Sequence, residues 1–436
     1  MATSRDVGRR SLLKAAGGSL AALGVAGAAG ACGGGGSGAG GTVTIRYAWW
    51  GAEDRAKRIN KCVALFEKKH PKIKVKTDFQ PYLDFWKKFN TQASGGGAPD
   101  VFQNAIGFLR KYDTRNVLLD LNAHAKGGDL KLDGFRAGLE KFGEVDGKLL
   151  GVPVGSNSMA LVIDKKVFDK AGVAPEMGWT WDDYHTALRK IRDTQKRAGD
   201  GGSFGIMYLY DPYLRQQGKA FFTEKGLGFT ESDLREWWAD GLAQVKSGLT
   251  ADAKKAVQIK PKSPTADGLA ASEFTWDNFT VRYTAEGDST YGLAPIPTTD
   301  GKKTGQYLGS LMLSGYKRTK HPKEVATFIN FMVHDPEVAR IMGYDRGVPT
   351  TTAQYEAYDP AKDKDPVLKK VNSDIAAYEE SLVKAKVLGP ITPHPAGADV
   401  VEAAFLRIAE EMSLGKRSTD DAVKAFFTEA KTALGA

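Results

Sequence analysis

The segment TVTIRYAWW, residues Thr42–Trp50, decides the fold class of this 436-residue chain. Large apolar side chains at Val43, Ile45, Tyr47 and Trp49 alternate with polar or small ones. An alternation of period two is typical of a β-strand with one face in the core. The segment therefore predicts a first strand, with Trp49 in the core and Trp50 at the end where the strand opens into a loop.

After this strand, segments with the helical period of 3.6 residues alternate with segments that have the strand period of two. Residues 53–70 have a helical pattern that Pro71 stops, and residues 73–79 alternate again. Residues 83–89 carry apolar side chains at helical spacing, and Val101-Phe102-Gln103 is predicted to be a short third strand. The order strand, helix, strand, helix, strand predicts an α/β protein with a doubly wound, parallel sheet.

The remainder of the chain continues this mixture. Further strands are predicted at residues 149–154, 159–163, 291–296 and 308–313, with helices starting near residues 181, 231, 322 and 336. Residues 363–436 have an almost entirely helical pattern. Asp182 and Asp183 could be mistaken for catalytic acids, but Thr180 and Asp183 have the spacing of a capping box. Thr230 and Asp233 repeat this spacing.

The first 41 residues have the features of an export signal followed by a tether. Arg9-Arg10-Ser11-Leu12-Leu13-Lys14 precedes an Ala/Gly-rich run, and this pair of arginines resembles a twin-arginine signal. Residues 1–31 are predicted to be the signal peptide. Cys32 after Ala-Gly-Ala resembles a lipobox cysteine, which predicts lipidation of Cys32 and a Gly/Ser tether over residues 32–41. A transmembrane anchor is the alternative, but the run is short and glycine-rich for a ~30 Å hydrocarbon core.

Composition excludes several classes of function. The net charge is +9, but the lysines are spread along the chain without the dense basic block of nucleic-acid-binding proteins. The six histidines lack metal-ligand spacing and no phosphate-binding loop is present, so we expect no metal, cofactor or catalytic centre. Cys62 shares a helical face with Ile59, Val63 and Phe66 and is predicted to be a buried, inert thiol.

The chain resembles the carbohydrate-binding solute-binding proteins (family 1) of ABC importers. The similar motifs occur in order along the chain: YAWWG (47–51), FEKKHPKIKV (66–75), APDVF (98–102), GKLLGVP (147–153), KKVFDKAG (165–172), WTWDD (179–183), YGLAPIP (291–297), LGS (308–310), ATFINF (326–331) and GVP (347–349). The chain departs from the family where the usual Tyr-Asn-Lys is Ile163-Asp164-Lys165, and where residues 268–276 match only loosely.

This resemblance implies a two-lobed periplasmic-binding-protein-like fold of type II. Each lobe would be a mostly parallel sheet flanked by helices, with the ligand cleft between the lobes. Lobe one would take residues 42–155 and 298–347, and lobe two residues 156–297 and 348–436. Residues 152–155 and 296–298 would then be hinge passages, where proline and glycine suit local dihedral changes.

Candidate site residues follow from the rule that ligands lie outside the carboxyl ends of strands in open α/β sheets. The residues at such positions are Trp50, Gln80, Tyr82, Gln103, Asn104, Asn157 and Ser158. They combine aromatic faces with amide and hydroxyl groups, which is the mixture that a sugar needs. Trp50 is the first candidate, with simple packing as its alternative.

Other candidates lie on the segments assigned to lobe two and near the hinges. Trp276-Asp277-Asn278 offers an aromatic face beside polar groups, or alternatively a turn with side-chain hydrogen bonds. Tyr208, Tyr210 and Asp211 form a third group. Gly309 and Ser310 could allow close backbone approach. Arg346 could bind a hydroxyl or an acid, or brace the hinge with Asp345.

The resemblance implies a non-enzymatic function: capture of a sugar or oligosaccharide by lobe closure, and delivery to an ABC permease. Its implied setting is extracytoplasmic, with a monomer held at the membrane through a lipid anchor. The alternatives left by the residues are a secreted polysaccharide-active enzyme, a surface adhesin or sensor, and a binding protein for a non-sugar solute.

Overall fold

The structure is a computed structural model that describes residues 41–136, 139–223, 226–389, 391 and 393–435. The predicted signal peptide and Cys32 lie outside the described residues. Residues Thr42–Ala436 form one compact unit. Within the described residues no helix is both long enough and apolar enough to cross a membrane.

The strands of this unit form a mixed sheet in the order β2-β1-β3-β12-β6-β10-β7, with β11 paired to β6 beside this path. Two small hairpins, β4–β5 and β8–β9, stand apart from it. The strands are β1 (Val43–Trp50), β2 (Ile73–Gln80), β3 (Val101–Ala105), β4 (Glu144–Val145), β5 (Lys148–Leu149), β6 (Val152–Asp164), β7 (Ala198–Asp200), β8 (Phe222–Thr223), β9 (Gly226–Leu227), β10 (Ala270–Trp276), β11 (Tyr291–Ala294) and β12 (Leu308–Gly315).

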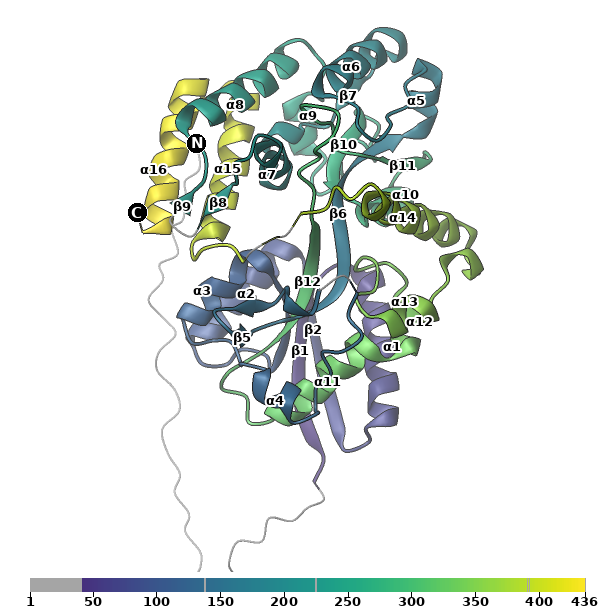
Figure 1. The fold of residues 1–436 in the computed structure, drawn as a ribbon, viewed down its shortest axis with the longest axis vertical. Helices are drawn as coiled ribbons and strands as arrows, with labels where there is room; N and C mark the ends of the chain where they lie inside the picture. Colours follow the sequence, from purple (N-terminus) through teal and green to yellow (C-terminus); the bar gives the residue numbers. More distant parts are fainter. Residues whose placement is uncertain (1–40, 137–138, 224–225, 390, 392, 436) are drawn as a thin grey trace, which may run out of the picture. The chain divides into compact units, whose positions relative to one another are not determined.

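Two lobes share this sheet (Figure 1). We name the part built around β1, β2, β3 and β12 lobe one, and the part built around β7, β10 and β11 lobe two. In lobe one β1 runs parallel to both β2 and β3, as the sequence predicts, and β12 runs antiparallel to β3. The carboxyl ends of β1 and β2 therefore meet at one edge, with Trp50 opposite Gln80.

β6 connects the lobes as one strand of 13 residues, where the sequence pattern predicts two separate strands. Its first half pairs with β12, from Val152 opposite Leu313 to Ser158 opposite Leu308. Its second half pairs with β10 and β11. The parallel arrangement predicted for each lobe holds for β1–β3 and for β7–β10. β6 is antiparallel to its lobe-two neighbours because it arrives from lobe one.

Helices cover both lobes (Figure 1). On lobe one they are α1 (Glu53–Lys69), α2 (Tyr82–Ser94), η1 (Ile106–Phe108), α3 (Leu109–Thr114), α4 (Asn122–Lys126), η2 (Leu139–Lys141), α11 (Pro322–His334), α12 (Pro336–Met342) and α13 (Thr352–Ala357). The others are α5 (Lys165–Ala171), α6 (Trp181–Gln195), η3 (Ser203–Gly205), α7 (Met207–Gln216), α8 (Glu231–Lys246), α9 (Ala253–Gln258), α10 (Phe279–Glu286), η4 (Pro360–Lys362), α14 (Pro366–Lys384), α15 (Ala398–Ser413) and α16 (Thr419–Leu434).

The alternation along β1 divides the core of lobe one between the two faces of its sheet. Tyr47 and Trp49 pack with the buried residues of α1, α11 and α12. Trp50 faces the opposite way and packs with Trp86 and Phe108. The predicted core position of Trp49 is confirmed, as are those of Trp86 and Trp238, while Trp181 is partly buried against the core of lobe two.

Several local predictions are confirmed. Thr180 with Asp183 and Thr230 with Asp233 form complete capping boxes at the starts of α6 and α8. The Asp182–Asp183 pair is thus at a helix start, where acidic side chains interact favourably with the helix dipole. Cys62 is fully buried, and burial raises the pKa of its thiol to about 12, so it is an inert core residue.

Two boundaries between the lobes differ from the predicted ones. The segment after Pro297, predicted to return to lobe one at once, stays on lobe two until β12. The reason is that Gln216 Nε2 donates to the carbonyls of Pro297 and Thr304, at 2.8 and 2.9 Å. The segment after Val348, predicted to enter lobe two, first packs on lobe one. There Gln354 Nε2 donates to the Met332 carbonyl at 3.0 Å.

Candidate functional site

An aromatic cluster lies where β10 of lobe two ends beside β12. The Trp276 ring lies 5.3 Å from the Tyr208 ring and 6.5 Å from the Tyr307 ring, centroid to centroid. A Cβ atom at Gly309 would come within 2.9 Å of the Trp276 ring, so glycine is what lets this ring lie against β12. These rings supply the flat apolar faces that a sugar ligand requires.

A small cavity next to this cluster has charged groups among its aromatic lining. Its lining residues are Met207, Tyr208, Asp211, Arg215, Phe221, Phe222, Tyr307 and His394. Asp211 accepts a 2.9 Å hydrogen bond from Arg215 Nε and another of 2.9 Å from the Phe221 amide. The Arg215 guanidinium lies over the Tyr307 ring, 4.8 Å from its centroid. Asp211 and Arg215 are therefore held in fixed positions at the cavity wall.

Lobe one meets this region through η1 and the start of α2. A Cβ atom at Gly107 would lie 3.7 Å from His394 Nδ1 and 4.0 Å from the Tyr208 hydroxyl. Tyr82 at the start of α2 is 41% exposed and stands edge-on to Trp50, with 5.5 Å between ring centroids. The cavity is thus at the junction of the two lobes, the position that the sequence predicts for the ligand.

The ionisable groups of this junction have shifted pKa values. Burial raises the pKa of Glu402 to about 7; the hydrogen bond from the Tyr208 hydroxyl, at 3.1 Å, opposes this rise and the charge of Asp399 adds to it. Burial, and then the charge of Arg215, lower the pKa of His394 to about 4. At neutral pH His394 is therefore an uncharged ring, able to exchange hydrogen bonds with a neutral polar ligand.

Buried polar groups also gather where β6 crosses between the lobes. Asp277 is fully buried; its amide donates to the Ser158 carbonyl at 2.9 Å, and its Oδ2 accepts a 2.9 Å hydrogen bond from the Ser158 amide. Its other oxygen has no hydrogen-bond partner among the described residues, and neither has Asn157 Oδ1. Burial, and then the nearby charge of Glu379, raise the pKa of Asp277 well above its usual value. Unpaired buried polar atoms are costly, so such groups are candidates for contact with a polar ligand.

Arg346 lies between lobe one and the crossing strand, and its predicted contact with a ligand stays a prediction. Its side chain is 5% exposed, and its Nη2 donates to the Tyr47 hydroxyl inside lobe one at 3.0 Å. Its carbonyl accepts a 3.1 Å hydrogen bond from Asn157 Nδ2 on the crossing strand. Asp345, the predicted partner, instead forms an ion pair with Arg55 at 2.7 Å. Arg346 therefore braces lobe one against β6.

Three other predicted site residues in lobe one, Trp50, Gln103 and Asn104, are buried within it. Trp50 is 8% exposed beneath Tyr82, and the simple-packing alternative describes its surroundings. Gln103 and Asn104 are fully buried on β3, where Asn104 Nδ2 donates to Ser314 Oγ at 3.0 Å. Gln80 is partly exposed at the end of β2.

The predicted lobe-two residues separate by helical face. Tyr210 is fully buried and packs against Phe405 and Trp237, so it is a core residue away from the cavity. Tyr208 and Asp211 lie on the other face of α7 and line the cavity. Ser310 Oγ donates to the Leu311 carbonyl, and Asn278 Nδ2 donates to the Asp345 carbonyl across the lobes at 3.3 Å.

Sequence reasoning missed Arg215, Tyr307, His394 and Glu402. Arg215 could have been predicted from the sequence, because Tyr208, Asp211 and Arg215 have the spacing of residues on one helical face. Tyr307 and His394 lie on segments outside helices and strands, where no period indicates their direction. Glu402 is one of many acids on an amphipathic helix.

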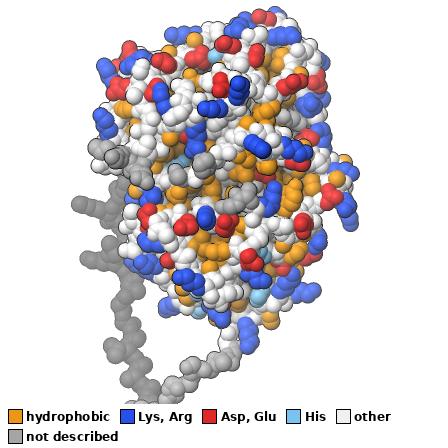
Figure 2. Space-filling model, in the orientation of Figure 1, with side chains coloured by type: hydrophobic (Ala, Val, Ile, Leu, Met, Phe, Trp, Pro, Cys, Tyr) orange, Lys and Arg blue, Asp and Glu red, His pale blue; other side chains and the backbone are white. Residues whose placement is uncertain are grey.

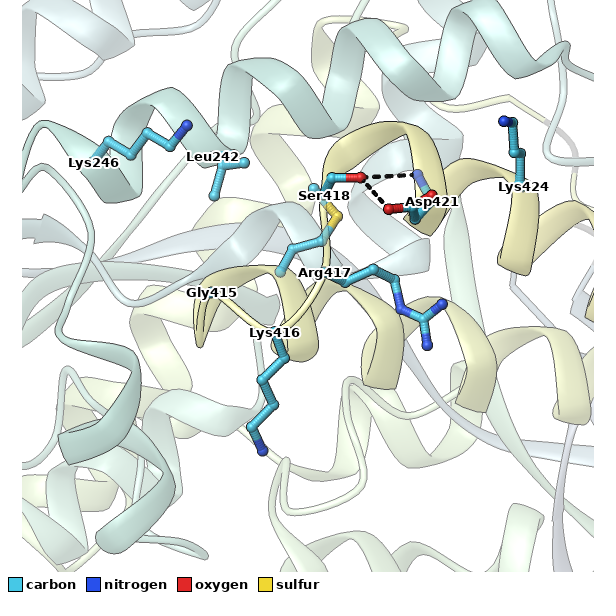
Figure 3. A pocket seen from close by; sticks show the side chains of 9 residues that line it. Leu242, Lys246, Gly415, Lys416, Arg417, Ser418, Asp421 and Lys424 are labelled. Atoms are coloured by element: carbon cyan, nitrogen blue, oxygen red, sulfur yellow. Dashed lines mark hydrogen bonds between the residues drawn. The ribbon is translucent and has the colours of Figure 1, made fainter.

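A second hollow lies at the turn between α15 and α16, beside α8 (Figure 3). Its polar lining includes Lys246, Lys416, Arg417 and Lys424, and Ser418 Oγ caps α16 through the Asp421 amide. It contains no aromatic side chain among its lining residues. The chemistry of this hollow therefore differs from that of the junction between the lobes.

Comparison with known proteins identifies the family. The profile described as bacterial extracellular solute-binding protein matches residues 41–338. The chain belongs to this family. The description of the family places the chain outside the cytoplasm, as the sequence predicts.

Individual relatives agree with this assignment. The arabinooligosaccharide-binding protein of Bacillus subtilis is 28% identical over 181 residues, which are 37% of this chain and 38% of that protein. A Yersinia enterocolitica oligogalacturonide-binding protein with bound digalacturonic acid has a TM-score of 0.77 and 21% identity, covering 90% of this chain and 99% of that one. An ABC substrate-binding protein of Listeria monocytogenes with cycloalternan has a TM-score of 0.75 and 20% identity, with the same coverage. The structural similarities confirm the two-lobed α/β fold.

Proposed function

We propose that this solute-binding protein captures a sugar or oligosaccharide between its lobes and delivers it to the permease of an ABC importer, without catalysing a reaction. The observation that supports a carbohydrate ligand is the Trp276, Tyr208 and Tyr307 cluster beside Asp211, Arg215 and neutral His394 at the lobe junction. Aromatic faces with a few fixed polar groups are the usual chemistry of sugar recognition. Relatives named for arabinooligosaccharide, oligogalacturonide and cycloalternan binding support the same class.

The proposed mechanism is closure of the lobes around the ligand. A ligand stabilises the closed form only by the additional contacts that it makes there, because an equilibrium responds only to differential affinity. Trp276 and Asp211 would hold the sugar from lobe two, while Tyr82 and the backbone at Gly107 would approach it from lobe one. β6, β12 and the segment at Val348, which pairs with Ser156, would act as the hinge.

The proposed setting follows from the N-terminal residues. Export through the twin-arginine signal, lipidation of Cys32 and a tether over residues 32–41 would hold a monomer at the outer face of the cytoplasmic membrane. We also propose lobe boundaries close to the predicted ones, residues 42–155 and 298–347 against 156–297 and 348–436. They are adjusted for the segments before Leu308 and after Val348.

A thermal-shift screen of the full chain tests the function. The panel contains neutral mono- and oligosaccharides, uronic acid oligomers, amino acids, short peptides and sugar phosphates. We expect a saturable rise in melting temperature with one carbohydrate series, because a ligand that binds only the folded state stabilises it. A response to peptides or phosphates alone would contradict a carbohydrate ligand. Turnover of a polysaccharide without any thermal shift would contradict the binding function.

A further inference from the structure

One partly buried ion pair joins the two lobes. Lys111 on α3 of lobe one pairs with Asp399 in the first turn of α15, and the two side chains are only 13% and 14% exposed. Leu109 and Tyr112, the neighbours of Lys111, belong to the core of lobe one. Val401 and Phe405 of α15 belong to the core of lobe two. The pair can therefore form only when the two cores are close together.

Each partner is held in place by its own lobe. The Lys111 ammonium lies over the Phe108 ring at 5.5 Å and over the Tyr112 ring at 5.7 Å from their centroids. Asp399 stands in the first turn of a 16-residue helix, where the helix dipole favours a negative charge. Separation of the lobes would leave both charges where they are and remove only their contact.

Asp399 has few other possible charge partners among the described residues. Its Oδ1 is buried and has no hydrogen-bond partner there. The nearest titratable group on its own helix is Glu402, and Tyr82 and Tyr112 face Asp399 from lobe one. None of these groups supplies a positive charge, so Lys111 is the cation that neutralises Asp399.

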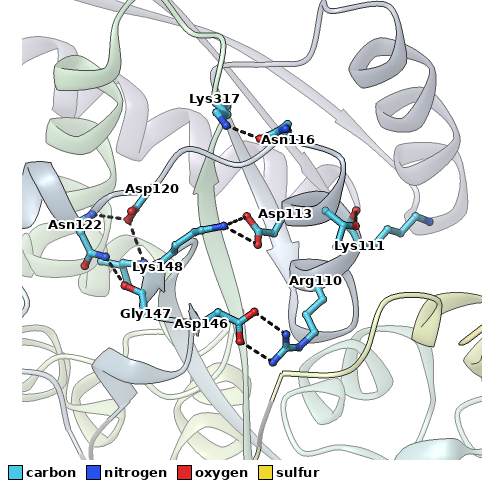
Figure 4. Close-up of polar contacts among 12 residues, drawn as sticks. Arg110, Lys111, Asp113, Asn116, Asp120, Asn122, Asp146, Gly147, Lys148 and Lys317 are labelled. Atoms are coloured by element: carbon cyan, nitrogen blue, oxygen red, sulfur yellow. Dashed lines mark hydrogen bonds and ion pairs between the residues drawn. The ribbon is translucent and has the colours of Figure 1, made fainter. Parts of the chain in front are cut away.

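Other ion pairs near this position differ in exposure and in what they connect. Lys148 with Asp113 and Arg110 with Asp146 link parts of lobe one to each other, and Figure 4 shows Lys111 directed away from them. The Lys148 and Asp146 side chains are 49% and 63% exposed. Exposed pairs of this kind contribute little to stability because water and salt screen them.

We propose that the Lys111–Asp399 ion pair is a latch that holds the two lobes together in the absence of ligand. Removal of one partner leaves the other charge buried and uncompensated in the closed form, whereas opening exposes it to water. The closed form should therefore lose population when either charge is removed and regain part of it when the charges are exchanged. The latch rests on the proposed function, since it presumes that the lobes open and close.

The test measures the distance between the lobes by electron spin resonance on unliganded full-length protein. A Cys32→Ser background carries spin labels at Lys72→Cys and Lys254→Cys, both exposed positions, while Cys62 is buried and escapes labelling. With Lys111 and Asp399 both present, we expect a population of molecules whose two labels are separated by the distance of the closed form. Lys111→Ala and Asp399→Ala should each raise the ratio of open to closed molecules about tenfold.

The exchanged variant Lys111→Asp/Asp399→Lys re-forms an ion pair and should recover part of the ratio, although its cation then stands at a helix N-terminus and its anion over aromatic rings. Lys148→Ala, which removes an ion pair inside lobe one, is the matched control and should leave the ratio unchanged. A protein without a closed population, or single variants whose ratio stays within about twofold of wild type, would overturn the latch. Because no ligand is added, this result is independent of whether a carbohydrate binds.

Discussion

Two tryptophans that end strands at the junction of the lobes, Trp50 and Trp276, have opposite surroundings. Trp50 ends β1 and is enclosed by Tyr82, Phe85 and Trp86, with ring centroids 5.3–5.5 Å away. Trp276 ends β10 near a cavity whose wall contains Asp211 and Arg215. Trp50 is 8% exposed, whereas Trp276 is partly exposed, so a strand-end position alone does not decide whether an aromatic side chain is available to a ligand. Figure 2 shows the same mixture at a larger scale, with hydrophobic side chains across the middle of the face drawn and charges of both signs around them.

The largest effect should come from Trp50→Ala. Loss of a buried aromatic side chain from a packed cluster lowers the free energy of unfolding by about 3–4 kcal/mol. We expect urea denaturation to show this loss, while the folded fraction keeps its carbohydrate affinity within about threefold. If Trp50 contacts the ligand directly, the affinity will fall by much more, and the contrast with Trp276 disappears.

Trp276→Ala should have the reverse effect. Removal of the aromatic face should weaken carbohydrate binding by about 100-fold, or about 2.7 kcal/mol, in isothermal titration with the sugar found in the screen. The stability loss should be smaller than for Trp50→Ala because the Trp276 side chain is only partly buried. Trp276→Phe keeps a flat apolar face and should retain most of the affinity. Full affinity in Trp276→Ala would remove this residue from the site.

The pH dependence of stability should distinguish Glu402 at the junction from Glu273 inside lobe two, since burial raises the pKa of both to about 7. An unfolded glutamate has its pKa near 4.3. The folded state therefore binds protons more tightly, and each group stabilises the fold at acidic pH and loses that contribution as the pH rises through 7. The free energy of unfolding should decrease between pH 5 and 8. In Glu402→Gln we expect this decrease to be smaller than in the wild type by about 1–2 kcal/mol.

Glu273→Gln is the matched variant. Urea denaturation at each pH should show a similarly reduced decrease in its unfolding free energy between pH 5 and 8. The two variants should differ in binding: only Glu402→Gln should alter the pH dependence of carbohydrate affinity, because only Glu402 lies beside Tyr208 at the cavity. An unchanged stability profile in Glu402→Gln would show that this carboxyl is ionised throughout the range.

Gly309→Ala should disturb the Trp276 face without removing it. The added methyl group would stand 2.9 Å from the ring and force it to move. We expect an affinity loss of about fivefold, or about 1 kcal/mol, in the same titration. Gly218→Ala is a poor comparison because Gly218 has a positive φ of 75°. Gly41→Ala meets no atom within 4 Å and should have no effect. An unchanged affinity in Gly309→Ala would mean that the ring position is unimportant.

The smallest effect should come from the basic hollow at the α15–α16 turn. Lys416→Ala and Lys424→Ala change exposed side chains and should alter stability by less than about 0.5 kcal/mol. Carbohydrate affinity should stay at the wild-type value in titration calorimetry. A clear loss of affinity would instead assign the ligand to this hollow and break the comparison between the two tryptophans.

The alternation of strands and helices from β1 to β3, the capping boxes, the buried Cys62 and the core position of Trp49 could all be predicted from the sequence. These features depend on local periods and on contacts between residues close in the chain, such as Thr180 with Asp183. The ordered motifs were sufficient to indicate the family and its two-lobed fold. They consequently favour the prediction of an extracellular, non-catalytic binding protein.

Which candidate residues come together depends on contacts between segments that are distant in the chain. Trp50 and Trp276 look alike in the sequence, and so do Tyr208 and Tyr210, yet in each pair the surroundings differ because of residues far away in the chain. The continuity of β6 and the return of the chain to lobe one at Leu308 likewise depend on partners such as β12 and Gln216. Burial and ligand access are properties of the assembled neighbourhood, so the sequence determined the fold while the packing of distant segments determined the site.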